Sequence, residues 1–455
     1  MTGHFVNNDF ELTSRQLALK YIPNQHTGSY LSNEITSIIK EWKIEKKVIN
    51  ATIDGGSNVN LAVDLIPCID KLRCLTHIMN LVTKKILNEN GTVQILNIVK
   101  KCRNLVCVFK HSNFLCEQLK KVMEINRNAA KELQSCSNDK ELPPVRKLKQ
   151  DVPTRWNSTY CMLKSVLDAH DSVKTVINGN AESKKKYSDL LLNNIEISVV
   201  EDLIELLLPF FQFTEMMSGT KYVTISIALP GITRLLEILQ IYKSKFNNKE
   251  IEVLAIQMHD DLADRTCAHF DNEMVIAATY LDPRYRKFTF VKDEEDRERM
   301  IQRAQKYIKS IYLTKFQQNE SFYVEPPTKK TRLDIRKENT NSFTLLYDAN
   351  KSIDSDESLV VTETDEIENE MKKYSAMKIK VTEHLNPLEF YKNNQMQFKR
   401  LSKFSKMLFS YTASSVPSEG SFSNAQDIIS DNRNRLTPFH AEELLMISQN
   451  KRLEL

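Results

Sequence analysis

The stretch KKVINATIDGGSN, residues Lys46–Asn58, carries the pattern that decides the fold class. Its apolar part has the length of a short strand and ends in Asp54. Two glycines then turn the chain into a segment with the apolar spacing of a helix. A second stretch, KLRCLTH (Lys71–His77), resembles another strand end that leads into a helix. Strands that alternate with helices predict an α/β layer architecture here.

Working outward, the sequence predicts strands in TGHFV and FELTSRQLALKYI and an amphipathic helix in HTGSYLSNEITSIIKEWKI. From Asn88 to Lys315 the apolar spacing is overwhelmingly helical, and it is helical again from Asn386 to Leu455. Residues 317–373 are polar, charged and weakly periodic, which predicts a disordered insertion. The chain therefore combines an α/β part with a large all-α part.

Composition limits the function classes. The chain has 455 residues, 41% apolar and 27% charged, enough for two or three globular domains. Its eight cysteines are irregularly spaced, as in reduced intracellular proteins, and we expect no secretory signal and no membrane-spanning helix. A net charge of +4 is too small to indicate nucleic-acid binding by itself. The cluster PPTKKTR (Pro326–Arg332) is either a nuclear import signal or a solvated charge run.

Two carboxylates are candidate catalytic groups. Asp54 closes a strand before a glycine-rich turn, where an open α/β sheet presents its ligand-binding edge, although it could simply cap the helix that begins near Ser57. Glu419 lies in SSVPSEGSFSNAQ (Ser414–Gln426). Its alternative role is structural, with Ser418 as the N-cap and Glu419 in the first helical turn, where the dipole favours negative charge.

Two further motifs are open to more than one interpretation. Cys74 and His77 are three residues apart, but no second Cys/His pair follows at zinc-finger distance, so we expect a buried thiol and a core histidine. DVPTRWNSTY (Asp151–Tyr160) places Arg155 beside Trp156. The pair could contact a phosphate and stack on an unpaired base, or the tryptophan could anchor the core.

Taken together and in order, six blocks resemble the hAT transposases and their domesticated BED-zinc-finger relatives. The blocks are TIDGGSN, RCLTHIMNLV, DVPTRWNSTY, YLDPRYRKF, NPLEFYKNN and SSVPSEGSFSNAQDIISDNRNRLTPFHAEELL. The resemblance spans nearly the whole chain, and the last block, the family's C-terminal dimerisation region, is highly specific. It implies an RNase H-like core in residues 1–165, a helical insertion in residues 166–385 with disorder at about 317–373, and a helical dimerisation region in residues 386–455 that completes the core.

The resemblance also implies roles for single residues. Asp54 matches the second and Glu419 the third ligand of an Asp-Asp-Glu triad that holds divalent metal. Cys74 and His77 match a Cys-x-x-His block, and Trp156 matches a tryptophan that stacks on a flipped base. The family's first Asp lies on a central strand upstream of the segment that matches TGHFV, and this strand and the BED finger are absent from the sequence. Loss of a central strand leaves facing edges unpaired, so we expect either that the sheet closes up or that the sequence is a transposon remnant or a shortened gene model whose complete version begins upstream.

These departures predict a transposase-derived nuclear protein that is catalytically inactive, forms a homodimer or higher homo-oligomer, and can bind DNA through Arg155 and Trp156. No cofactor is expected, and Mg²⁺ would bind only to an active nuclease. One alternative is an active transposase whose first Asp comes from a longer isoform. The other is a dimerising scaffold without DNA contact. Self-association is assigned to two predicted helices, the second beginning at Thr437–Pro438, with the apolar residues Phe422, Ile428, Ile429, Leu444 and Leu445.

Overall fold

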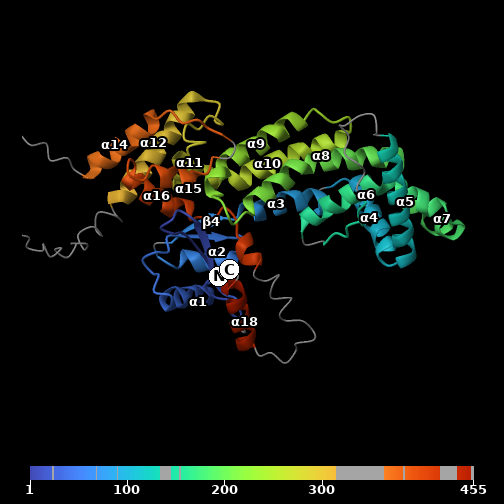
Figure 1. Ribbon diagram of the computed structural model, residues 1–455, viewed down its shortest axis with the longest axis horizontal. Helices are drawn as coiled ribbons and strands as arrows, with labels where there is room; N and C mark the ends of the chain where they lie inside the picture. Colours follow the sequence, from blue (N-terminus) through green and yellow to red (C-terminus); the bar gives the residue numbers. More distant parts are fainter. Residues whose placement is uncertain are drawn as a thin grey trace, which may run out of the picture.

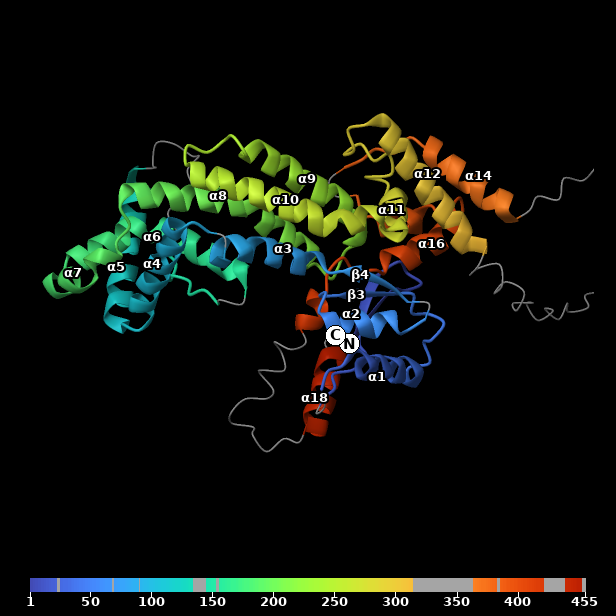
Figure 2. The same ribbon diagram turned by 180° about the vertical axis from the view of Figure 1, so that it is seen from behind.

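The computed structural model describes residues 1–22, 25–67, 69–89, 91–133, 145–152, 155–313, 363–382, 385–420 and 438–451. These residues are mostly helical, with four short strands. The helices form a long layer, and a smaller α/β part lies against one side of it, as both views show (Figures 1 and 2). The predicted combination of α/β and all-α structure is confirmed at this level.

The strands form two separate pairs. β1 (Thr2–Val6) is antiparallel to β2 (Leu12–Gln16), and β3 (Asn50–Ile53) is parallel to β4 (Asp70–Arg73). No ladder joins β1 to β3 in the described part of the chain. The expected closing up of the sheet is therefore not seen among the described residues.

Two helices cover one face of these strands. α1 (Gly28–Glu41) begins after Thr27, whose side chain accepts a hydrogen bond from the Tyr30 backbone N–H, as an N-cap should. α2 (Ser57–Asp64) begins after the glycine turn that the sequence predicts. In both views α1 and α2 lie on one side of β3 and β4, and α16 (Lys399–Phe409) lies on the other (Figures 1 and 2).

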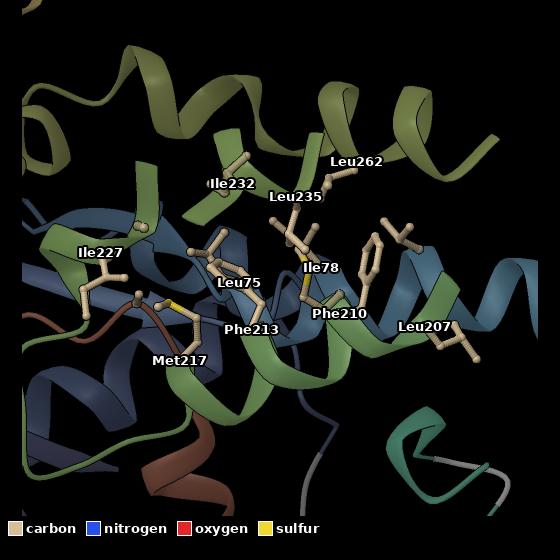
Figure 3. Packing of buried hydrophobic residues seen from close by; sticks show 14 of the residues in the cluster. Leu75, Ile78, Leu207, Phe210, Phe213, Met217, Ile227, Ile232, Leu235 and Leu262 are labelled. Carbon is tan, nitrogen blue, oxygen red and sulfur yellow. The ribbon is translucent and has the colours of Figure 1, made fainter. Parts of the chain in front are cut away.

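The middle and one end of the long layer are a helical bundle. Its members are α3 (Leu75–Lys84) with the π-helical turn Lys85–Glu89, α4 (Val93–Lys110), α5 (Asn113–Leu133), α6 (Trp156–Asn178), α7 (Ala181–Tyr187), α8 (Asn194–Met217), α9 (Ala228–Tyr242) and α10 (Lys249–Asp271). Figure 3 shows how Ile78 of α3, Phe210 and Phe213 of α8, and Leu235 of α9 meet in its core. The predicted helical character of this region is confirmed.

The opposite end of the layer contains α11 (Glu273–Leu281), α12 (Glu294–Ile311), α14 (Glu363–Ala376), α15 (Pro387–Asn393) and α16. Residues 363–373 belong to α14, so the last part of the predicted disordered insertion is helical. The reason is an apolar spacing that the charged residues obscure, since Ile367 and Met371 are buried. Residues 317–362, with PPTKKTR among them, lie outside the described residues.

One segment, Ile225–Tyr242, is long and apolar enough to cross a membrane by length and composition alone. It contains α9, whose Leu229, Ile232 and Leu235 are buried in the bundle core. A buried core helix of a soluble bundle passes the same test.

The last described helix is α18 (Pro438–Lys451), which begins at Pro438 as the sequence predicts. It lies against β2, and the Asn450 side chain accepts from the Gln16 backbone N–H (3.1 Å) and donates to the Gln16 carbonyl (3.2 Å). An amide side chain thereby occupies the place of a neighbouring strand on the outer edge of β2.

Candidate functional site

The candidate site lies at the carboxyl ends of β3 and β4. Because these strands are parallel, Asp54, which follows β3, and Arg73, which ends β4, lie at the same edge. Asp54 is exposed, and its Oδ1 accepts a hydrogen bond from the Gly56 backbone N–H (3.0 Å). This bond closes the turn before α2 and is not a helix cap, because Gly56 is itself the N-cap residue and α2 has no side-chain cap hydrogen bond.

Gly55 brings the guanidinium of Arg73 close to this turn. Gly55 has φ +94°, which side chains other than glycine rarely tolerate, and a Cβ there would lie 3.0 Å from Nε of Arg73. Sequence reasoning did not select Arg73. The available signal was a basic residue at the end of the strand that follows the one with Asp54.

A segment from near the other end of the chain crosses the same edge. Thr52 Oγ1 donates to the Thr412 carbonyl (2.6 Å), and the Leu75 backbone N–H donates to the Ala413 carbonyl (2.9 Å). The hydroxyls of Thr2 and Ser418 are also hydrogen-bonded to each other. Residues 412–418 are therefore attached to β1, β3 and the start of α3.

Cys74 is the centre of this attachment. It is fully buried, its Sγ lies 3.0 Å from the Thr76 hydroxyl, and it accepts a hydrogen bond from the Ser415 backbone N–H (3.2 Å). Thr76 and Ser414 are hydrogen-bonded at 2.9 Å. The expected buried thiol is thus present, whereas His77 is only partly buried. Within the described ranges no three His, Cys, Asp or Glu side chains gather as metal ligands would.

Glu419 is carried to this region by the same segment. The helical residues of this segment begin at Val416, and the Val416 backbone N–H donates a hydrogen bond to the Ser414 hydroxyl (3.1 Å). Ser418 therefore lies inside the helix, and the prediction that it is the N-cap is wrong. Glu419 is exposed, and its Oε1 accepts from the Ser415 hydroxyl (3.4 Å). Asp54 and Glu419 are therefore both attached to the edge where β3 and β4 end, but the described residues supply no third ligand and do not fit a two-metal site.

The second candidate surface is the start of α6. Arg155 is exposed, but Trp156 is 3% exposed and belongs to the hydrophobic core. The core-anchor interpretation therefore describes Trp156 in this structure. Base stacking would require its ring to become accessible.

The segment before α6 is held by a buried ion pair. Asp151 has a side chain with 0% exposure, and Arg103 of α4 donates to it through Nε (3.0 and 2.9 Å) and Nη2 (2.7 Å). Burial alone would raise the pKa of Asp151, but the hydrogen bonds and charge of Arg103 outweigh it, so the pKa lies below its ordinary value. This pair fixes the chain immediately ahead of Arg155.

The motifs YLDPRYRKF and NPLEFYKNN meet in the core. The fully buried Asp282 accepts from the Ser226 hydroxyl (2.7 Å) and from Nη2 of Arg284 (2.8 Å). The hydroxyls of Tyr374 and Tyr391 both donate to the Leu281 carbonyl (2.8 and 3.0 Å), and burial raises the pKa of each tyrosine well above its ordinary range. These contacts join the two blocks to each other and to α14.

Three family descriptions match the chain. They are a ZBED1 RNase-like domain over residues 1–77, a ZBED1 RNase-like helical domain over residues 72–206, and the hAT family C-terminal dimerisation region over residues 366–451. The chain is a hAT-derived, ZBED1-like protein. The resemblance identified from its sequence blocks is confirmed.

Relatives of this hAT-derived protein agree with that assignment. It is 25% identical to "Putative AC transposase" of Zea mays over 98% of its own length and 54% of the relative. It is 25% identical to the transposable element Hobo transposase of Drosophila melanogaster, with 53% of the chain and 31% of the relative covered. It is also 25% identical to zinc finger BED domain-containing protein 6 of Homo sapiens, with 61% of the chain and 24% of the relative covered. The chain spans about half the length of the curated relatives that match it throughout.

The hAT dimerisation region of the protein contains α18 and its apolar residues. Leu445 is 2% exposed, whereas Leu444 and Ile447 are 42% and 50% exposed. Phe422, Ile428 and Ile429 lie outside the described residues. The two leucines that the sequence assigns to one interface therefore face different surroundings.

Proposed function

We propose that this hAT-derived protein is a self-associating nuclear protein that binds DNA and does not cleave it. The observation that carries the proposal is the hAT C-terminal dimerisation region over residues 366–451, which includes a helix with exposed apolar side chains. Nuclear localisation and DNA contact are supported by the names of the relatives, which are transposases and BED zinc finger proteins.

Self-association is the part with the most direct support. Leu444 and Ile447 lie three residues apart on α18, so they share one helix face, and both are exposed. Leu445 is buried and holds the helix against the rest of the chain. The two roles can therefore be separated by mutation.

The test is light scattering of the wild type and of the Leu444→Asp/Ile447→Asp variant at micromolar concentration. We expect an oligomer for the wild type and a shift toward the 52.7 kDa monomer for the variant, with unchanged helical circular dichroism. Ile195→Asp is the matched control, because Ile195 is 70% exposed on the distant α8. A monomeric wild type would contradict the proposal.

DNA contact is assigned to the exposed Arg155. A guanidinium pairs well with phosphate, and loss of one phosphate contact should lower the salt dependence of binding by about 0.9 in log K against log salt. Trp156→Ala is unsuitable because Trp156 is a core residue. We therefore expect Arg155→Glu to weaken duplex or hairpin DNA binding, while Lys174→Glu, an exposed change on the same helix, leaves it nearly unchanged.

Absence of cleavage is supported by the arrangement around the exposed carboxylates. Asp54 and Glu419 each accept a local hydrogen bond, and the described residues bring no third ligand to them. Purified protein should not nick supercoiled DNA in Mg²⁺ or Mn²⁺. Nicking that disappears in Asp54→Ala would favour the active-transposase alternative.

A further inference from the structure

The segment ahead of α6 lies along the first turns of that helix. The Val152 backbone N–H donates to the Ser158 hydroxyl (2.7 Å), and the Lys149 backbone N–H donates to the Ser165 hydroxyl (3.0 Å). Three residues of extended chain span about 10 Å, and seven residues of helix span the same distance. The two contacts therefore fit a nearly extended segment that runs antiparallel to the start of α6.

The apolar side chains and the carboxylate of this segment face the protein. Val145 and Leu148 pack against the hydrophobic core. The buried Asp151 is paired with Arg103 of α4. Apolar contacts and an ion pair therefore fix the segment in place, so its exposed side chains project from a rigid support.

Basic side chains occupy the exposed side of the segment and of the start of α6. This basic row consists of Arg146, Lys147, Lys149, Arg155 and Lys164, all of which are exposed. None of the five forms an ion pair with another residue that the structure describes. Asp151, which Arg103 neutralises, is the only acid among residues 145–164. With five cations and one carboxylate, this stretch has a formal charge of +4, as much as the whole chain.

The length of the basic row follows from these contacts. The Lys149 backbone lies beside Ser165, which is ten residues along α6 from Arg155, or about 15 Å. Lys147 lies two residues further along the segment, which adds about 7 Å. The row from Arg155 to Lys147 is therefore about 20 Å long. At about 3.4 Å of helix axis per base pair, this length corresponds to about six base pairs of duplex DNA.

The other side chains of this stretch favour a phosphate backbone as the partner. The rings of Trp156 and Tyr160 are each 3% exposed, so no flat surface is available for stacking on bases. Val152 is the one exposed large apolar side chain among the described residues of the stretch, too little for a protein interface. A duplex carries twice the charge of a single strand per unit length, so it gains most from a row of cations.

We propose that the basic row binds the phosphate backbone of duplex DNA over about six base pairs beyond Arg155, without regard to base sequence. This inference rests on the proposed DNA binding, and it assigns the surface that carries the duplex. Lys147, Lys149 and Lys164 each contact a phosphate. The exposed Asp168, one helical turn beyond Lys164, ends the row because a carboxylate repels phosphate.

The probe is a fluorescent DNA duplex of about 20 base pairs, titrated with the full chain by polarisation between about 50 and 200 mM salt. The variant Lys147→Gln/Lys149→Gln/Lys164→Gln removes three phosphate contacts and leaves Arg155 in place. The slope of log K against log salt should therefore be less steep by about 2.7. Over this fourfold range of salt, the wild-type affinity should fall about 40 times more than that of the variant.

The matched control is Lys372→Gln/Lys378→Gln/Lys380→Gln. It removes the same number of charges from exposed positions on α14 and just after it, at the opposite end of the helical layer. The control should keep the wild-type slope. A second duplex of unrelated sequence should bind the wild type within about twofold of the first, because phosphate contacts carry no sequence information.

Lysine acetylation followed by mass spectrometry locates the bound duplex. DNA should protect Lys147, Lys149 and Lys164 from acetylation and should not protect the three control lysines. A wild type that binds duplex, together with a glutamine variant that keeps the full salt dependence, would overturn the basic row and leave DNA contact through Arg155 standing. Tighter binding of a single strand of equal length would also overturn it. A wild type that binds no duplex would overturn both this inference and the proposed DNA binding.

Discussion

Replacing Arg103 by Met tests whether the chain ahead of Arg155 depends on a buried ion pair. The change removes three hydrogen bonds to Asp151 at 2.7–3.0 Å and keeps the aliphatic volume of the side chain. Asp151, at 0% side-chain exposure, would remain as a carboxylate without a countercharge. Only the weaker donors Gln150 (3.2 Å) and Thr159 (3.4 Å) would remain.

Removing one partner of a fully buried pair costs about 3–5 kcal/mol. Because the Arg103 side chain is 34% exposed and two donors to Asp151 remain, Arg103→Met should cost about 2 kcal/mol. The deficit should depend on pH. In the wild type the lowered pKa of Asp151 contributes stability above the ordinary aspartate value of about 3.9, and this contribution is lost as the pH falls through the folded-state pKa. In the variant, burying a protonated Asp151 costs less free energy than burying its carboxylate. The loss of unfolding free energy relative to the wild type should therefore be smaller at pH 4.5 than at pH 7.

Urea unfolding followed by the fluorescence of Trp156, in a Trp42→Phe background, measures the free energy in this part of the chain. Adding Asp151→Asn to Arg103→Met should recover most of the loss, because the uncompensated charge is removed. Lys100→Met, an exposed change on the same helix, should stay within about 0.5 kcal/mol. A deficit that is equally large at both pH values, or that Asp151→Asn does not reduce, would refute the electrostatic account.

Three further changes have defined outcomes. Burial lowers the pKa of His4 to about 4, so as the pH falls the unfolded chain binds a proton before the folded chain does. The free energy of unfolding should therefore decrease between pH 6.5 and 4, by at most about 3 kcal/mol. His4→Gln should remove this pH dependence in urea titrations. Asn450→Leu should remove both hydrogen bonds between this side chain and the Gln16 backbone and cost about 2 kcal/mol, measured as faster amide exchange in α18 but not in α8. Gly55→Ala should cost about 1–2 kcal/mol in urea unfolding because of its positive φ, whereas Gly420→Ala, with nothing within 4 Å of the added Cβ, should change stability little.

Much of the local structure is predictable from sequence. TGHFV is predicted as a strand and forms β1, a short apolar run with a glycine turn predicts β3 and α2, and Pro438 predicts the start of α18. The strand predicted in FELTSRQLALKYI is observed only over Leu12–Gln16. These signals are local, because they depend on backbone preference and on apolar spacing within a few residues. The pairing of the strands is not local, because each pair depends on contacts between separate segments of the chain.

The candidate site shows the same limit. Asp54 and Glu419 could be selected by type and position, but the attachment of residues 412–418 to Thr52 and Cys74 depends on contacts across more than 300 residues. The leucines of α18 are a second case. Leu444 and Leu445 belong to one apolar stripe in sequence, yet only Leu445 is buried, because the position of β2 decides which side of the helix is covered.

The attachment of the chain's last helices to its first strands has a consequence for synthesis on the ribosome. Thr2 meets Ser418, and Gln16 meets Asn450, at separations of 416 and 434 residues. At about 5–20 residues per second, the strand pairs would wait roughly 20–90 s for their C-terminal neighbours. During that interval the outer edge of β2, which Asn450 of α18 later covers, would be available to other nascent chains or to chaperones. A premature stop codon anywhere before α18 would make this vulnerable state permanent, so truncated products should be cleared or aggregate even when their helical bundle is complete.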